Sequence, residues 1–229
     1  MAHGQGHSVD DYLEVIYFLA FPIGEYRPAS GSSAIAARVA EMLGVSRASA
    51  GEMLKRLEAE GLVERGEHKE AILTPTGIER AEKVVRKHRI IERFLTDFMG
   101  YTASESHVQA DVMGDTFTDE MIELINERLG FPDRCPHGWP VEPDVEQEEN
   151  AGLLALTELQ PGQEGEIVRL AEHDGDLLEW FYGEGFAPGS RVLLREAHPA
   201  AGEFKVDLDG DERAIAEKAA LGLYIRVAA

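Results

Sequence analysis

The sequence predicts a mainly α-helical chain with a small amount of β-structure: a winged helix-turn-helix, a helical domain and a small C-terminal β-barrel. Helical apolar periodicity dominates the chain up to Leu129, and a β-rich stretch over 62–74 interrupts it. After an acidic, proline-rich linker, short β-like runs alternate with glycine-rich turns. The expected boundaries are 1–75 for the winged helix-turn-helix, 76–141 for the helical domain, 142–152 for the linker and 153–229 for the barrel.

The distribution of charge favours a nucleic-acid-binding segment near the N-terminus. The net charge of −21 over 229 residues argues against a polyanionic partner for the chain as a whole. Residues 26–93, however, carry 13 basic and 10 acidic side chains, whereas residues 101–229 carry 9 and 28. The net-basic stretch therefore coincides with the candidate helix-turn-helix.

The sequence gives no sign of export or of a membrane anchor. It has no long apolar run that would span a bilayer, and its polar first residues lack the apolar core of a signal peptide. The single cysteine, Cys135, excludes an internal disulfide framework. We therefore expect a cytoplasmic protein with no membrane partner.

The helix-turn-helix is the first motif that carries a function. A helical stripe over 9–21 is followed by two helical patterns over 32–60, which are broken at Gly44. Ser46 is suited to cap the second of these helices, over 47–60, whose N-terminal end enters the major groove in this motif. Arg47 and Ser49 are placed for bases or phosphates, and Lys55 and Arg56 for phosphates. The candidate DNA contacts on this helix are Ser46, Arg47, Ser49, Lys55 and Arg56.

The stretch over 62–74 predicts the wing, a short hairpin with its tip at 66–69. Arg65 and Lys69 are available there for contact with the DNA backbone. A helical hairpin followed by two strands is not specific by itself. The order helix, turn, helix and wing, with "GLVER" directly after the second helix, favours DNA binding.

Two long helices are expected after the wing, over 76–99 and 104–129. Gly100 ends the first, and a capping box of Thr102 and Glu105 begins the second. Apolar residues lie on more than one stripe of these helices, for example Phe94, Phe98, Met121, Ile122 and Ile125. A helix that is apolar on several sides needs partners on several sides, so we expect a homodimer.

Polar side chains on three of the predicted helices suggest a metal site. They are His88 and Glu92, then His107, Asp111 and Asp115, and on the first helix Asp11 and Glu14. Each set alone has an ordinary explanation: a hydrogen-bonded core pair, a solvated face, or charges that favour a helix N-terminus. Together, on helices expected to pack against one another, they favour metal binding, because a carboxylate on an apolar stripe is costly without a partner. Carboxylates with imidazoles suit Mn²⁺ or Fe²⁺, and Zn²⁺ or Co²⁺ would compete.

The sequence resembles the diphtheria toxin repressor family, which includes iron-dependent and manganese-dependent regulators. The resemblance covers essentially the whole chain and is carried by "DDYLEVIYFL", "AARVAEMLGVSRASAGEMLKRLEAEGLVER", "LTPTGIERAEKVVRKHRIIERFLTDFMG", "HVQADVMGDTFTDEM" and "CPHGWPVEP". The tail from "LTELQPGQEGEIVRL" onward resembles the SH3-like domain that ends longer members. The resemblance implies a repressor that binds double-stranded operator DNA as a dimer when it is loaded with metal.

The resemblance also implies two metal sites per subunit. One uses the positions of His88, Glu92 and His107 with a side chain from the SH3-like domain; alignment places Glu172 there, with His173 and Asp174 as alternatives. The other uses the positions of Asp11, Asp111, Gly114 and Asp115. Asp11 stands where iron-type members have methionine, which favours manganese. Because Gly114 has no ligating side chain, this second site is expected to be weaker, or completed by water or by Glu14.

Two other functions are compatible with parts of the sequence. A small metal-dependent hydrolase would also need clustered histidines and carboxylates, but it leaves the helix-turn-helix unexplained and lacks a second set of acid–base groups. A constitutive architectural protein would bind DNA equally well in the presence of a chelator. The metal-activated repressor is the function we expect.

Overall fold

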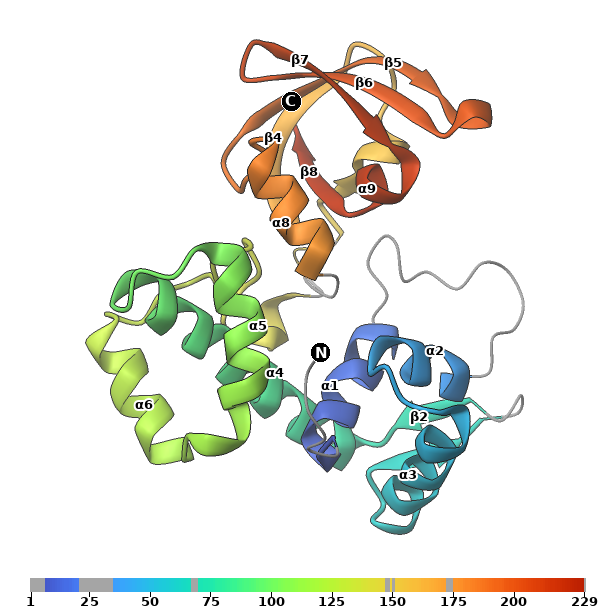
Figure 1. Cartoon of the computed structure of the whole chain (residues 1–229), viewed down its shortest axis with the longest axis vertical. Helices are drawn as coiled ribbons and strands as arrows, with labels where there is room; N and C mark the ends of the chain where they lie inside the picture. The colour runs from blue at the N-terminus through green and yellow to red at the C-terminus, as the bar shows by residue number, and fades with distance from the viewer. Residues whose placement is uncertain are drawn as a thin grey trace. The chain divides into compact units, whose positions relative to one another are not determined.

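The computed structural model describes residues 7–20, 35–66, 70–146, 149, 151–171 and 175–228. The chain forms two compact units, Met1–Val85 and Arg86–Ala229, which are described separately (Figure 1). The long helix α4 (Pro75–Asp97) begins in the first unit and ends in the second. Among the described helices, none has both the length and the hydropathy needed to cross a bilayer.

The N-terminal unit is a winged helix-turn-helix, as predicted. Its elements are α1 (Val9–Ala20), α2 (Ile35–Met42), α3 (Arg47–Ala59), β1 (Val63–Arg65) and β2 (Ala71–Leu73). Its core includes the fully buried Leu13 and Ile16 of α1 and Leu54 of α3. The two strands pair antiparallel as the wing. The apolar spacing of α1 and α3 therefore produces this core.

Capping fixes the start of helix α3. Gly44 takes a left-handed conformation with φ +63° in the turn before it, a conformation that glycine adopts without steric cost. The Ser46 hydroxyl accepts a hydrogen bond of 3.0 Å from the Ser49 amide. Both residues act as the sequence predicts.

The second unit begins with helices, and here one prediction was wrong. A single helix was expected over 104–129, but the chain forms α5 (Ala103–Met113), a 3₁₀ turn η2 (Gly114–Thr116) and α6 (Asp119–Arg128). The cause lies in Thr118, which starts a new helix. Its backbone is extended, and its hydroxyl caps the helix by accepting a hydrogen bond of 3.3 Å from the Met121 amide. Asp115 therefore belongs to the turn η2 and not to α5.

The rest of the unit is a curved six-stranded sheet with two helices, in agreement with the predicted small barrel (Figure 1). The strand order is β3-β8-β4-β5-β6-β7, with antiparallel pairing throughout. Its elements are β3 (Leu154–Ala155), β4 (Glu164–Leu170), α8 (Gly175–Gly183), β5 (Arg191–His198), β6 (Glu203–Leu208), β7 (Asp211–Ala216), α9 (Glu217–Leu221) and β8 (Leu223–Val227), with short 3₁₀ turns η3 (Pro143–Val145), η4 (Leu156–Glu158) and η5 (Pro199–Ala201). The core of the sheet includes Phe181 of α8 and Phe186, both fully buried.

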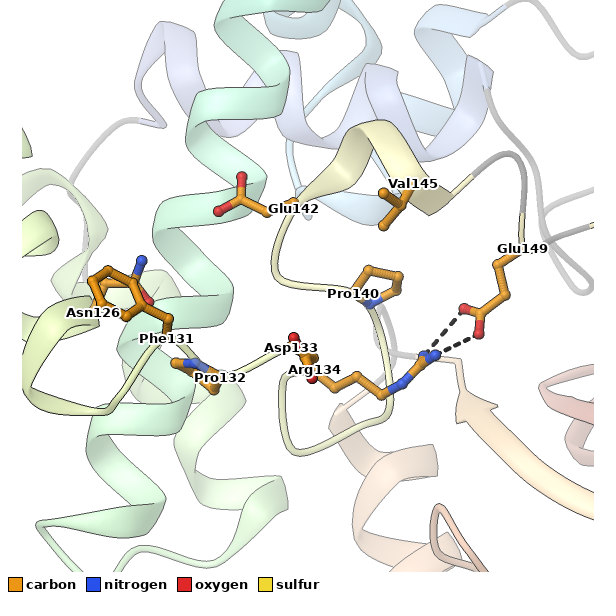
Figure 2. Close-up of a pocket in the computed structure, with 9 residues that line it drawn as sticks. All are labelled: Asn126, Phe131, Pro132, Asp133, Arg134, Pro140, Glu142, Val145 and Glu149. Atoms are coloured by element: carbon orange, nitrogen blue, oxygen red, sulfur yellow. Dashed lines mark hydrogen bonds and ion pairs between the residues drawn. The ribbon is translucent and has the colours of Figure 1, made fainter.

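The segment between α6 and the sheet is held by ion pairs. Glu149 accepts hydrogen bonds from Arg134, from Arg169 of β4 and from Arg226 of β8, the last at 2.8 Å. Figure 2 shows the Arg134–Glu149 pair at the edge of a cavity of about 420 Å³. This carboxylate therefore ties the segment to two strands of the sheet.

We expect the Glu149→Gln variant to unfold more easily, by about 1 to 2 kcal/mol at neutral pH, because solvent screens ion pairs that are only partly buried. Burial would raise the pKa of Glu149, but hydrogen bonds from Arg134 and Arg169 lower it to about 2. Because the pKa is lower in the folded state, the carboxylate stabilises the fold at neutral pH, and this stabilisation is lost as the pH falls from about 4.5 through 2. Burial lowers the pKa of Arg169, which offsets part of the gain.

Urea unfolding of the full chain, followed by tryptophan fluorescence, measures this effect. The difference between parent and variant should be full at pH 7 and should vanish near pH 2. An equal difference at both pH values would contradict the role given to Glu149. The Glu196→Gln variant removes an exposed partner of Lys205 and should have little effect.

Candidate metal centre

Helix α4 brings two polar side chains into the core of the second unit. His88 and Glu92 lie one helical turn apart, so they share a face, and His88 Nε2 is 3.0 Å from Glu92 Oε1. Glu92 is fully buried and His88 nearly so. The pair interrupts an apolar surface that includes Ile91 and Leu95. The structure thus places both residues where the sequence predicted them.

Helix α5 adds a second imidazole. Thr102 and Glu105 form the predicted capping box, which starts α5 and sets its register. His107 then points into the same site, with Nδ1 2.9 Å from Glu92 Oε1 and 3.1 Å from His88 Nε2. His88, Glu92 and His107 together offer ligand atoms that all lie within 4.8 Å of one another.

A third imidazole, which the sequence analysis did not assign to the site, comes from His137. It is fully buried, and its Nε2 lies 3.2 Å from Glu92 Oε1. Three imidazole nitrogens therefore lie within 3.2 Å of one carboxylate oxygen. His137 belongs to the run "CPHGWP", which supported the family resemblance but did not by itself indicate a ligand. Helical periodicity could not reveal it, because the residue lies in a loop.

The loop that carries His137 is fixed against strand β4. The His137 carbonyl accepts from the Leu170 amide at 3.0 Å, and the Trp139 ring donates to the Leu170 carbonyl at 2.6 Å. Gly138 lies between them with φ +89°, and a Cβ at this position would stand 1.9 Å from the Val168 carbonyl oxygen. Only glycine allows this approach, and the approach sets the position of His137.

The electrostatics of the cluster favour an ionised Glu92. Burial would raise the pKa of Glu92, but the neighbouring His137, His88 and His107 hold it well below its ordinary value. Burial would lower the pKa of His107, whereas its hydrogen bond to Glu92 and the charge of Asp111 raise it. The site is therefore built around one buried negative charge that is balanced by imidazoles.

A metal ion fits this donor set. Among the described residues, Glu92 Oε2 is buried without a hydrogen-bond partner, and so is His137 Nε2, apart from its 3.2 Å approach to Glu92 Oε1. Buried polar atoms without partners are costly, and a cation would satisfy both of them. A purely structural hydrogen-bonded cluster would leave them unsatisfied. One carboxylate and three imidazoles are ligands that divalent transition metals accept.

The other predicted ligands are distributed differently. Asp111 is half exposed on α5, and its Oδ1 lies 3.3 Å from His88 Nδ1, whereas Glu92 approaches the other nitrogen of that ring. Asp11 and Glu14 lie on α1 of the first unit. At the start of α1 the Ser8 hydroxyl accepts from the Asp11 amide, and the Asp11 carboxylate accepts from the Ser8 amide. Gly114 lies in the turn η2. A second site built from Asp11, Glu14, Asp111 and Asp115 stays a prediction.

Several predicted residues lie outside the described part of the chain. They are Lys69 at the tip of the wing, Glu172, His173 and Asp174 before α8, and the side chain of Asp115. The proposed ligand from the C-terminal domain is therefore not placed by the structure.

The predicted DNA contacts on α3 are exposed, and two of the five, Lys55 and Arg56, have acidic partners. Lys55 pairs with Glu52 at 2.7 Å, and Arg56 pairs with Glu60 at 2.8 Å. Arg65 of β1 lies 3.3 Å from Glu58. Within the described ranges, Arg47 forms no ion pair. Arg47 is thus the cation of this helix that is most available to a phosphate or a base.

The chain matches three family models that follow one another along its length. They are "Iron dependent repressor, N-terminal DNA binding domain" over residues 6–71, "Iron dependent repressor, metal binding and dimerisation domain" over residues 74–142, and "FeoA domain" over residues 154–227. Together they place a repressor pattern on the helical part and a separate small β-domain on the tail.

Individual relatives agree with these models. The chain is 31% identical over 210 residues to the iron-dependent repressor IdeR of Mycobacterium leprae. This alignment covers 84% of this chain and 85% of the relative. A solved manganese-dependent transcriptional repressor in complex with manganese superposes with a TM-score of 0.84 at 28% identity, over 96% of this chain and all of the other. The manganese regulator SloR superposes with a TM-score of 0.80 at 28% identity, over 96% and 99%.

Proposed function

Because the chain belongs to the diphtheria toxin repressor family of metal-dependent transcriptional repressors, we propose that His88, Glu92, His107 and His137 bind the metal ion that activates it for DNA. The observation that carries this proposal is the buried Glu92 carboxylate, which has three imidazole nitrogens around one oxygen and no hydrogen-bond partner at the other among the described residues. The matches are to transcription regulators, so the chain is a regulator and not an enzyme. The alternative of a small hydrolase has no support.

The donor set suits Fe²⁺ or Mn²⁺. Three imidazoles favour Fe²⁺, and they would also accept Zn²⁺ or Co²⁺. The oxygen ligands of a second site, drawn from Asp11, Glu14, Asp111 and Asp115, would favour Mn²⁺. Glu172, or its neighbour His173 or Asp174, would complete the first site. When bound, the ion supplies the positive charge that holds α4, α5 and the loop of His137 together.

The DNA-binding surface is proposed to be α3 with the wing. Ser46, Arg47, Ser49, Lys55 and Arg56 would meet operator DNA from α3, and Arg65 and Lys69 from the wing. The proposed domains keep the boundaries 1–75, 76–141, 142–152 and 153–229. A cytoplasmic site of action, where the DNA is, belongs to the same proposal.

A DNA-binding assay on fragments upstream of metal-uptake genes tests the function. The protein is first treated with chelator, and each divalent metal is then restored in turn. Binding should require Mn²⁺ or Fe²⁺ and should weaken steeply as salt rises, because phosphate contacts release counterions. Equal affinity with chelator and with metal would contradict the proposal and would favour an architectural protein.

We expect the Arg47→Ala variant to lose affinity for operator DNA by about 10- to 100-fold, because a cation that reaches a base or a phosphate is removed. Metal affinity should be unchanged. Fluorescence anisotropy with labelled DNA, at fixed salt and saturating metal, measures the effect. The Lys205→Ala variant removes an equal charge from β6 and is the matched control. Equal affinity for both variants would remove Arg47 from the interface.

The helical part also presents apolar side chains that a single subunit leaves exposed. Among the described residues of α4, α5, α6 and their connections they are Phe98, Met99, Tyr101, Val108, Val112, Met121, Leu124 and Phe131. Of the five side chains named in the sequence argument for a dimer, Phe98 and Met121 are exposed. Ile122 lies in the subunit's own core, and Phe94 and Ile125 are partly buried against that core. Exposed apolar surface of this kind marks an interaction site, which supports the proposed homodimer.

We expect the Phe98→Glu variant to weaken the dimer by about 30-fold or more, since loss of a central apolar side chain commonly costs about 2 kcal/mol of association energy. Sedimentation equilibrium across a range of protein concentrations measures this. The Leu154→Glu variant changes an exposed apolar residue of β3 and should leave the dimer intact. A parent protein that is monomeric at micromolar concentration with metal present would refute the dimer.

A further inference from the structure

A tyrosine of the C-terminal sheet domain lies directly behind the metal centre. Tyr182 belongs to α8, and its hydroxyl is 3.0 Å from the Pro136 carbonyl oxygen and 3.1 Å from His137 Nδ1. The two rings also contact each other, with centroids 5.9 Å apart. The hydroxyl therefore meets two polar atoms of the loop that carries His137.

The hydrogen-bond directions follow from counting hydrogens. A carbonyl oxygen only accepts, so Tyr182 must donate its one hydrogen to Pro136. Its oxygen then has only lone pairs left for His137, and the His137 Nδ1 must be the donor. Nδ1 therefore carries a proton. The other ring nitrogen, Nε2, is the one that faces Glu92 at 3.2 Å.

This arrangement decides which nitrogen of His137 is available as a ligand. In a neutral imidazole one nitrogen carries the proton and the other holds a lone pair. A metal-bound histidine normally donates its remaining N–H to a carboxylate, a carbonyl or a water, and this contact fixes its orientation. Here a tyrosine hydroxyl takes that place, backed by a main-chain carbonyl.

We propose that Tyr182 is a positioning residue of the metal centre, which holds His137 in the Nδ1–H form with Nε2 directed at the ion. This inference rests on the proposed function, because it concerns the same site. Through Tyr182 of α8 the sheet domain would contribute to metal binding, independently of any ligand from residues 172–174. The ring contact alone would hold the loop but would not select a nitrogen.

The Tyr182→Phe variant separates these two roles, since it keeps the ring and removes the hydroxyl. The first measurement is the ¹⁵N spectrum of histidine-labelled, metal-free full-length protein, with His137 assigned by comparison with a His137→Gln variant. In the parent, Nδ1 of His137 should be protonated. In Tyr182→Phe, which takes away the acceptor, the proton should move towards Nε2, where the Glu92 carboxylate can accept it.

The second measurement is the affinity for Mn²⁺ by calorimetry. Tyr182→Phe should bind about 10- to 100-fold more weakly, as expected for loss of a group that orients a ligand. The Glu179→Gln variant, which changes an exposed side chain of the same helix α8, is the control and should match the parent.

The outcomes separate this inference from the proposed function. An unprotonated Nδ1 in the parent overturns the inference without any variant. Weaker metal binding with an unchanged proton position also overturns it, because the tyrosine would then act only through packing. Failure of metal to activate DNA binding in the parent counts against the proposed function, whereas the position of the proton is read without metal or DNA.

Discussion

The Glu92→Gln variant is expected to lose metal binding at the His88–His107–His137 cluster, with an affinity for Mn²⁺ more than about 100-fold below that of the parent. Glutamine keeps the shape of the side chain but removes the buried charge around which the three imidazoles gather. Thermal and urea unfolding with added metal measure the loss. At a Mn²⁺ concentration 100 times the parent Kd, the parent gains about 2.7 kcal/mol of stability and the variant less than about 0.5 kcal/mol.

The control for this variant lies on the same helix. Glu79→Gln removes an exposed carboxylate of α4 that pairs with Lys83, and its metal affinity should equal that of the parent. Circular dichroism without metal establishes that Glu92→Gln is folded. A folded variant that binds Mn²⁺ as tightly as the parent would show that Glu92 is not a ligand.

The Gly138→Ala variant should disturb the same site from its other side. A methyl group would stand 1.9 Å from the Val168 carbonyl oxygen, and φ +89° is a conformation that alanine rarely adopts. The loop must therefore move away from β4, which breaks the hydrogen bond from Leu170 to His137. We expect a loss of about 3 kcal/mol or more in the free energy of unfolding, together with weaker metal binding.

Gly162 provides a control that separates the two causes. It has φ +91°, nearly that of Gly138, but nothing lies within 4 Å of the position of its Cβ. Gly162→Ala therefore has the backbone strain without the collision, and it should cost about 1 kcal/mol with unchanged metal affinity. Equal losses in the two variants would show that the close approach to Val168 does not hold the loop.

Much of the fold followed from the sequence because its signals are local. The caps at Ser46 and Thr102, the left-handed turn at Gly44 and the apolar stripes of α1 and α3 act over a few residues, and each is found where it was expected. The break at Thr118 was missed because the apolar pattern continues across it, and periodicity alone does not reveal a new cap.

The candidate metal centre was predicted only in part, because sequence patterns record local spacing and not long-range contacts. His88, Glu92 and His107 lie on helices, where a spacing of four residues or a shared apolar face reveals them. His137 and Tyr182 reach the site through a loop and through the sheet domain, 30 or more residues further along the chain. Their positions depend on long-range contacts such as the hydrogen bond between Trp139 and Leu170, which no local pattern records.

The measurement that tests the central claim most directly is the linkage between metal and DNA. If the ion at Glu92 activates the repressor, metal must raise the affinity for operator DNA, and operator DNA must raise the affinity for metal by the same factor. Both factors are measured on the full-length parent, by anisotropy titrations with DNA at zero and saturating Mn²⁺ and by calorimetric titrations with Mn²⁺ with and without operator. The account predicts equal factors of about 5 to 150 in the parent and factors near one in Glu92→Gln. A metal affinity in the parent that operator DNA leaves unchanged would contradict it.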